Sequence, residues 1–461
     1  MSAPFVNPVD FLREGAGPVG EKIFPGLKVF QHALRAIGKA NRADINACKV
    51  TAIMALWTVL MMALRRTASI ESAFRNCLCL IPELADCKLD QVVTLNAVHN
   101  ARKRLGAEPL RLMFESMAAE LTQSPTFGGL VLVLLDGSRI TLPDTDANAK
   151  YFGRPSNQLG DGNFPQGALL VLTTEYDRKI LAMRIHPGNT DEHKAAFYFL
   201  DFLKPWHLLI MDRGIPSAEL LLELHKRKIP YVARIPNDWN VEVVTSHGPG
   251  DHTVHLLRDD CKLPPLRLVE YVTANQKGED QQVRLLTEQR DIPAGLFPSL
   301  YHHRWEVETC LGCFKDLLAP TQGDQPLIVR SKSPDLVCQE LYAGAIVANL
   351  IRERGGREAE KTENLPTQYS FSNWCETTRT NVASQMTRKS PLPLATKSNR
   401  LPTRSRTNRS FPRQTRVHRH RFPMRRGRHV QHFHDPNIRL ATSERTLSGK
   451  KAHPKRRKAA V

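Results

Sequence analysis

The sequence lacks the marks of secreted, membrane-spanning and nucleotide-binding proteins. Its longest apolar run, residues 50–64, is interrupted by Thr51 and Thr58 and is shorter than the roughly 20 residues that span a membrane. We interpret this run as a buried helix. The chain does not open with a basic segment followed by an apolar core, so no signal peptide is predicted. It has no glycine-rich phosphate loop, and no nucleotide cofactor is expected.

A cysteine framework is also missing. The chain of 461 residues has nine scattered cysteines, and an odd number in a chain of this size argues against structural disulfides. Cys310 and Cys313 have the spacing of zinc ligands, but the second pair that a four-ligand zinc site needs does not follow. Together these absences predict a protein of the reducing cytoplasm with no membrane partner.

Acidic residues are nearly absent from the C-terminal part of the chain. Residues 386–461 hold 22 Lys and Arg but only Asp435 and Glu444, a net charge of +20, whereas the other 385 residues have a net charge of −1. Low apolar content and the lack of periodicity predict a disordered, low-complexity tail here. The tail is either a nucleic-acid-binding arm or the product of an aberrantly read end of a degraded coding sequence.

The spacing of apolar residues divides the part of the chain before the tail into two predicted domains. Residues 1–125 have apolar positions three and four apart, which is typical of helices. Residues 126–355 alternate strands and helices, which favours an α/β fold with crossover helices, and the tail covers residues 356–461. Helices are predicted at 23–39, 45–66, 97–121, 191–203, 217–228, 298–318 and 336–351, strands at 130–135, 168–174, 179–185, 207–211 and 231–235, and strand-rich sequence at about 236–296.

Two aspartates follow predicted buried strands. Asp136 comes directly after residues 130–135, Asp212 comes directly after residues 207–211, and a glycine turn is expected after each. In open α/β sheets, ligands bind at the carboxyl ends of the strands, so both aspartates are candidate site residues. Each also allows the plainer interpretation of a solvated turn residue.

Four polar residues share one face of the predicted helix 298–318. Tyr301, Arg304, Glu308 and Lys315 fall within a stripe about 60° wide at about 100° per residue. Such a stripe is either a solvated charged face or a surface that meets a specific partner. The apolar residues between them, such as Phe314, favour the second interpretation.

Three carboxylates in this setting are what a two-metal phosphodiester site requires. Mg²⁺ prefers oxygen ligands and needs few of them, because it retains water and binds substrate phosphate. Two ions about 3.5–4 Å apart stabilise both oxygens of an in-line displacement. Asp136, Asp212 and Glu308 are the candidate ligands, and Arg304 and Lys315 would then meet DNA phosphate, which positions DNA without reading its sequence.

Residues 301–315 resemble the Tyr-x2-Arg-x3-Glu-x6-Lys signature of insertion-sequence DDE transposases of the IS-four type, and they match it at all four positions. The segments 136–138 (Asp-Gly-Ser) and 212–214 (Asp-Arg-Gly) resemble the first and second acidic blocks of this family. Residues 152–155 and 164–166 also resemble the family sequence between those blocks.

The resemblance implies a ribonuclease-H-like mixed sheet with flanking helices and a β-rich insertion at about 236–296. An α-helical domain that binds terminal inverted repeats would precede it, and the disordered basic tail would follow. The implied reaction is cut-and-paste transposition. Asp136, Asp212 and Glu308 would be the catalytic acids and bind two Mg²⁺ ions, with Mn²⁺ as a substitute, while Tyr301, Arg304 and Lys315 would bind the DNA.

The family also implies a homodimer that pairs two ends, acts on target DNA and is associated with the nucleoid. Two other functions remain open: a catalytically inactive DNA-binding regulator from a decayed insertion sequence, and a host nuclease of the same fold without strand transfer. The three acids favour the enzyme, and the tail favours the regulator. Some relatives open the end through a DNA hairpin and use a tryptophan of the insertion, but Trp239 is the only tryptophan in 236–296, so the strand-opening route stays open.

Overall fold

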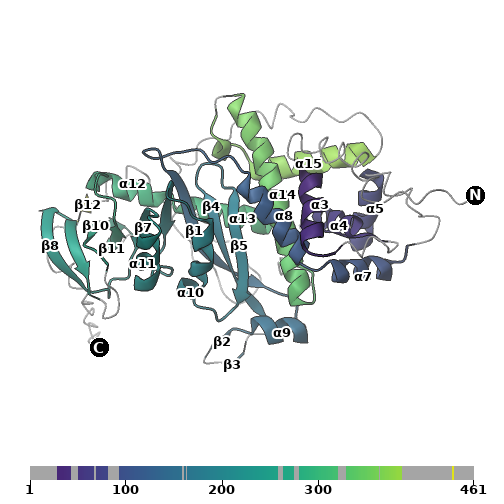
Figure 1. Ribbon diagram of the computed structural model, residues 1–461, viewed down its shortest axis with the longest axis horizontal. Helices are drawn as coiled ribbons and strands as arrows, with labels where there is room; N and C mark the ends of the chain where they lie inside the picture. The colour runs from purple at the N-terminus through teal and green to yellow at the C-terminus, as the bar shows by residue number, and fades with distance from the viewer. Residues whose placement is uncertain are drawn as a thin grey trace, which may run out of the picture. The chain divides into compact units, whose positions relative to one another are not determined.

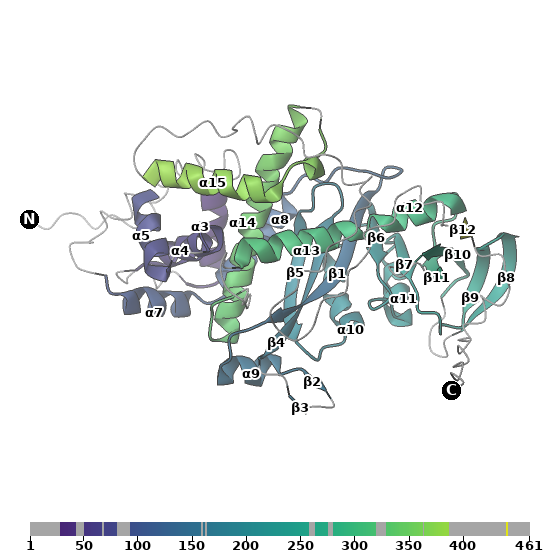
Figure 2. The same ribbon diagram turned by 180° about the vertical axis from the view of Figure 1, so that it is seen from behind.

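The computed structural model describes residues 28–42, 50–66, 69–80, 93–157, 160–161, 164–257, 263–274, 280–319, 329–362, 364–386 and 439–440 (Figures 1 and 2). The chain forms two compact units. Unit 1 comprises residues 1–124, 137–191 and 307–403, and unit 2 comprises residues 125–136, 192–306 and 404–461. Strand β1 (Val131–Thr141) and helix α13 (Trp305–Leu318) contribute residues to both units. The domain boundaries inferred from the sequence stay a prediction.

Unit 1 is mainly helical. The long helix α14 lies against α4, α8 and α15 (Figure 1). Its residues 339–352 are all buried, as expected of a helix surrounded by protein on every side. The described helices that lie wholly in this unit are α3 (Val29–Lys39), α4 (Ala52–Leu64), α5 (Ile70–Leu80), α7 (Leu95–Leu105), α8 (Glu108–Ala119), α9 (Asp146–Phe152), α14 (Pro334–Glu360), the 3-10 helix η4 (Pro366–Gln368) and α15 (Phe371–Met386).

Helix α4 confirms the interpretation of the long apolar run. Thr51 caps its N-terminus by accepting a hydrogen bond from the Met54 amide, which satisfies one of the unpaired amides of the first turn. Every residue from Ala52 to Leu64 is buried. None of the described helices is long and apolar enough to cross a membrane.

The predicted helix 97–121 is two helices, α7 and α8. The first ends at Gly106, whose φ of 68° lies in the left-handed region that glycine adopts at little cost. Pro109 stands in the first turn of α8, where a missing amide hydrogen is tolerated. The shared periodicity of the two helices concealed this break.

Helix α15 corrects the expectation that no helix follows residue 356. Its buried residues include Trp374, Thr378, Asn381 and Val382, at the three- and four-residue spacing of an amphipathic helix. Two of these four are polar, so an apolar pattern could not reveal the helix. The tail beyond α15 lies outside the described residues except for the short strand β12 (Arg439–Leu440), so its disorder stays a prediction.

The strands follow the order β5-β4-β1-β6-β7-β11-β10-β9-β8. The pairs β1–β6 and β6–β7 are parallel, and β4–β5 is an antiparallel hairpin. A mixed sheet of parallel and antiparallel strands, as expected from the sequence, is therefore present. The bounds are β4 (Gln166–Thr174), β5 (Ile180–Pro187), β6 (His207–Met211), β7 (Tyr231–Arg234), β8 (Val241–Gly248), β9 (Asp251–Leu256), β10 (Leu266–Ala274) and β11 (Asp280–Thr287), with a separate small pair β2 (Ser156–Asn157) and β3 (Gly160–Asp161).

The insertion in unit 2 is β-rich, as predicted for residues 236–296. Strands β8 to β11 are antiparallel, and β11 joins the parallel strands by pairing with β7. The buried side chain of Arg284 donates hydrogen bonds to Glu270 and to the carbonyl of Trp239, both at 2.9 Å. Trp239 is itself only 6% exposed, so its indole belongs to the core of the insertion.

Two of the predicted helices, at 191–203 and 298–318, are interrupted. Residues 191–203 form α10 (Glu192–Ala196) and the 3-10 helix η2 (Phe197–Phe202). Residues 298–318 form α12 (Phe297–His302), preceded by the 3-10 helix η3 (Ala294–Leu296), and then α13. The predicted helix at 217–228 is α11 (Ala218–Lys226), which Ser217 caps through the Leu220 amide.

Candidate active site

Two neighbouring strands of unit 2 bring Asp136 and Asp212 side by side. The parallel register of β1 and β6 ends with Leu135 opposite Met211, and the two aspartates are the next residues on the two strands. Matching positions of paired strands project to the same face of a sheet. Both carboxylates therefore stand at one edge position.

The setting of Asp136 differs from the sequence-based expectation. The apolar run ends at Leu135, but β1 continues to Thr141, so Asp136 lies inside the strand rather than in a turn after it. Polar residues carry the strand onward, and Ile140 returns to the core. Asp212 does follow the end of β6, as predicted.

Tyr301 and Arg304 bind this aspartate pair. The Tyr301 hydroxyl donates a hydrogen bond of 2.8 Å to Asp212 Oδ1. Arg304 Nη1 lies 3.5 Å from Asp136 Oδ2 and 3.8 Å from Asp212 Oδ2, so one guanidinium contacts both carboxylates. Arg304 also stacks on the Trp305 ring, 4.9 Å from its centroid. Of the predicted site residues, these four are brought together in unit 2.

The break between α12 and α13 positions these two side chains. The amides of His303 and Arg304 bond to carbonyls three residues earlier, those of Leu300 and Tyr301, which is the tighter 3-10 pattern. Tyr301 thus lies in the last turn of α12, and Arg304 lies in the turn between the helices. The sequence-based prediction of one continuous helical face is wrong at this point.

The electrostatics of the site keep Asp212 charged. Burial alone would raise the pKa of its carboxyl, but Arg304, the Arg213 amide and the Tyr301 hydroxyl outweigh burial and hold that pKa below its usual value. Burial, and then the charge of Asp212, raise the pKa of the Tyr301 phenol well above its usual value. At neutral pH the tyrosine is therefore the donor and the aspartate the acceptor.

Glu308 and Lys315 lie on the part of α13 that belongs to unit 1. Glu308 is exposed. Lys315 donates a hydrogen bond to the Ser138 hydroxyl, and burial lowers the pKa of its amine. A half-buried cation that hydrogen-bonds a single hydroxyl is well suited to exchange that partner for a phosphate oxygen.

Sequence reasoning missed two site residues. Arg234 Nη1 lies 3.5 Å from Asp212 Oδ1, and Ser138 receives the hydrogen bond of Lys315. Arg234 is the last residue of β7, which pairs with β6. The rule that singled out the ends of β1 and β6 would have found it if applied to the next strand.

The aspartate pair has the donors of a divalent-cation site. Both residues offer carboxylate oxygens, which Mg²⁺ prefers, and Asp212 is held in its charged form. The described part of the chain contains no group of three or more His, Cys, Asp or Glu side chains that could hold a metal ion. A metal triad that includes Glu308 stays a prediction.

Parts of this chain are similar to known transposases. Residues 128–320 match the family described as "Transposase DDE domain", and residues 29–115 match "Insertion element 4 transposase N-terminal". The chain is 27% identical over 385 residues to the Escherichia coli protein "Transposase InsG for insertion sequence element IS4". The aligned region covers 80% of this chain and 84% of that protein. A cryo-EM structure of the piggyBac transposase synaptic complex with hairpin DNA aligns with a TM-score of 0.40 and 12% identity over 77% of each chain.

Proposed function

We propose that the chain is a DDE transposase of an insertion sequence, which cuts DNA at the ends of such an element and joins each freed 3′-hydroxyl to target DNA. The observation that carries this proposal is the pair Asp136 and Asp212, in register on two parallel strands and held by Arg304. Two aspartates that share contact with the guanidinium of Arg304 are suited to phosphodiester chemistry. We expect a homodimer to act on two paired ends.

Each residue near the aspartates has a distinct role. Tyr301 fixes the orientation of the Asp212 carboxylate through its hydrogen bond. Arg304 holds both carboxylates in the DNA-free protein and binds a phosphate oxygen when the DNA end arrives. Lys315 binds a second phosphate of the same end. Charge-assisted bonds of this kind are stronger than neutral ones and place the scissile phosphate firmly.

Asp136, Asp212 and Glu308 are the residues that would hold two Mg²⁺ ions, and Mn²⁺ is the expected substitute. Such ions supply charge that stabilises the attacking and leaving oxygens. Water is the first nucleophile and frees the 3′-hydroxyl at each end. That hydroxyl is the second nucleophile and attacks a phosphodiester of the target, so the same carboxylates serve both steps.

A cleavage assay tests the proposal. Purified protein, Mg²⁺ and a duplex carrying the sequences that flank its own coding frame are combined, and strand breaks and joined products are resolved on gels. Asp136→Asn, Asp212→Asn and Glu308→Gln should each abolish cleavage and leave DNA binding intact. Breaks that persist in all three variants would refute the site assignment.

Two matched variants control for the loss of an exposed acid elsewhere. Asp201→Asn changes an exposed aspartate of unit 2 that pairs with Arg227, and Asp316→Asn changes an exposed acid of α13. Both should cleave as the unaltered protein does. Binding without any cleavage would support the inactive regulator, and cleavage without joining would support a nuclease.

A further inference from the structure

Helix α7 carries a polar, basic face that the proposed active site does not use. The helix contains no Asp or Glu, and Asn96, Asn100 and Lys103 are exposed. At about 100° per residue these three positions lie within about 60° of one another, on the side opposite the buried residues of the helix. Arg104 is also exposed and flanks this face.

The buried side of α7 packs against neighbouring helices of unit 1. Val98, Ala101 and Leu105 are buried, and the helix packs against α4 and α5. Both views of the structure place α7 at the rim of this helical group (Figures 1 and 2). One long side of α7 is therefore committed to the core, and the polar side faces outward.

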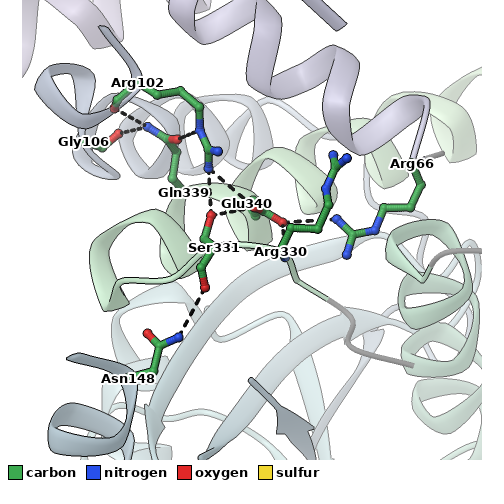
Figure 3. Close-up of polar contacts among 8 residues, drawn as sticks. All are labelled: Arg66, Arg102, Gly106, Asn148, Arg330, Ser331, Gln339 and Glu340. Atoms are coloured by element: carbon green, nitrogen blue, oxygen red, sulfur yellow. Dashed lines mark hydrogen bonds and ion pairs between the residues drawn. The ribbon is translucent and has the colours of Figure 1, made fainter. Parts of the chain in front are cut away.

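A network of hydrogen bonds fixes the end of α7 to α14 (Figure 3). Arg102 donates to Gln339 at 2.7 Å and to Ser331 at 2.9 Å. Gln339 in return donates to the carbonyls of Arg102 and Gly106, at 3.1 and 2.7 Å. The bond to Gly106 gives a partner to a carbonyl that follows the last turn of the helix. The outward face is thus presented on a rigid support.

We propose that α7 lies in the major groove of the element's terminal DNA and reads base edges with Asn96, Asn100 and Lys103. This inference rests on the proposed function, because it names the surface that would recognise the DNA ends. A helix fits the major groove, which is about 12 Å wide. Asparagine pairs with the two groove-side nitrogens of adenine, and lysine pairs with guanine. The absence of acids removes repulsion from phosphates.

Two neighbouring helices fit this role less well. In α8, Arg111 is neutralised by Glu108 and Glu115, so this helix has no net positive face. In α3, Gln31 and Arg35 are exposed, which offers one amide where α7 offers two. We therefore use α3 as the control and propose α7 as the helix that recognises the base edges.

A binding experiment on the full chain tests this proposal without using cleavage. The affinity for a duplex carrying the element's terminal sequence is compared with that for a shuffled duplex of equal length and composition, at fixed salt. The double variant Asn96→Ala and Asn100→Ala should lower the ratio of the two affinities by more than the roughly 5- to 150-fold expected for the loss of one base contact. Affinity for the shuffled duplex should stay the same.

Arg35→Ala provides the matched control, because it removes an exposed cation from α3. Arg35→Ala should lower the affinity for both duplexes by the same factor and leave the ratio of the two affinities unchanged. An unchanged ratio in the α7 double variant overturns the proposal, as does a loss of the ratio in Arg35→Ala alone. An α7-dependent preference in a protein that never cleaves DNA would refute the proposed function and leave the role of α7 standing.

Discussion

Tyr301 donates a hydrogen bond of 2.8 Å to Asp212 and thereby joins the end of helix α12 to the end of strand β6. The tyrosine is 7% exposed, and its raised pKa keeps the hydroxyl protonated. The phenol is therefore always the donor of this hydrogen bond, and the carboxylate is the acceptor. It engages Oδ1 of Asp212, while Oδ2 is the oxygen that faces Arg304.

Removing that hydroxyl tests its contribution. Tyr301→Phe keeps the ring and deletes the hydrogen bond, and a bond to a charged group contributes about 1.5–3 kcal/mol. We expect the single-turnover cleavage rate on terminal DNA to fall roughly 10- to 100-fold. Tyr151→Phe, at an exposed tyrosine, should leave the rate unchanged. Equal rates for the two variants would show that Tyr301 does not position Asp212.

Arg304 should not be replaceable by lysine. A lysine has one compact ammonium group in place of a planar fork, so it cannot contact both carboxylates as Arg304 does. Arg304→Lys should lower cleavage at least about tenfold, the effect of roughly 1.4 kcal/mol. The conservative control is Arg227→Lys, at an exposed pair with Asp201. Full activity of Arg304→Lys would mean that positive charge alone suffices there.

Metal dependence can be assigned to one carboxylate by changing its chemistry. Thiolates are soft ligands that bind Mg²⁺ poorly and accept softer ions more readily. Asp136→Cys should be inactive with Mg²⁺ and recover part of its cleavage with Mn²⁺, whereas Asp136→Ser should stay inactive with both. Chelation should abolish cleavage by the unaltered protein and spare its DNA binding. Identical behaviour of the cysteine and serine variants would argue against Asp136 as a ligand.

The buried carboxylate of Glu340 should be a major source of stability in unit 1. It accepts hydrogen bonds from Arg66 at 3.2 Å, from Ser331 at 2.5 Å and from the Arg330 amide at 3.0 Å. Breaking a buried ion pair from one side costs about 3–5 kcal/mol. We expect Glu340→Gln to lower the free energy of unfolding by that amount in urea titrations. Glu71→Gln, which alters an exposed pair with Arg75, should change it by less than about 1 kcal/mol.

The same group predicts a direction for the effect of pH. Burial would raise the pKa of Glu340, but Arg102, Ser331, the Arg330 amide and Arg66 outweigh burial and lower it. Its stabilisation is therefore complete above the ordinary pKa of glutamate and is lost as the pH falls through the lowered folded value. The stability difference between the unaltered protein and Glu340→Gln should narrow on acidification. A constant difference down to low pH would contradict this account.

The basic tail should affect the salt dependence of DNA binding. Each phosphate contact adds about 0.9 to the slope of log affinity against log salt concentration. Removing residues 387–461, which leaves α15 complete, should flatten this slope for nonspecific DNA. The measurement is a fluorescence titration at several salt concentrations. An unchanged slope would mean that the tail does not touch DNA.

The sequence anticipated the parts of the site that depend on local pattern. The apolar runs before Asp136 and Asp212 predict the two buried strands, although β1 continues beyond Asp136. The spacing of Tyr301 and Arg304 predicts one helical face, but Arg304 lies in the turn after α12. The contact of Ser138 depends on the placement of α13 beside β1, and that of Arg234 depends on the pairing of β7 with β6. A local pattern can mark Arg234 as a strand end, but it shows neither contact. The break after His302 was hidden because a 3-10 turn nearly preserves the helical spacing.

Helices with polar buried faces were the other source of error. In α15, Thr378 and Asn381 occupy buried positions, and Thr378 donates to the carbonyl of Trp374 at 2.8 Å. The Thr378 hydroxyl thus satisfies its hydrogen bond within the helix and can be buried at little cost. A prediction based only on apolar residues therefore assigns residues 371–386 to a loop.

The continuation of β1 through Asp136 limits which changes in chain length this site can tolerate. Side chains alternate between the two faces of a strand, so inserting or deleting one residue before Asp136 would turn its carboxylate to the opposite face. Asp212 stands where β6 has ended and a turn begins, and length changes after it are absorbed by that turn. Among homologous chains, alignment gaps should therefore be excluded from residues 131–141 and permitted soon after residue 214.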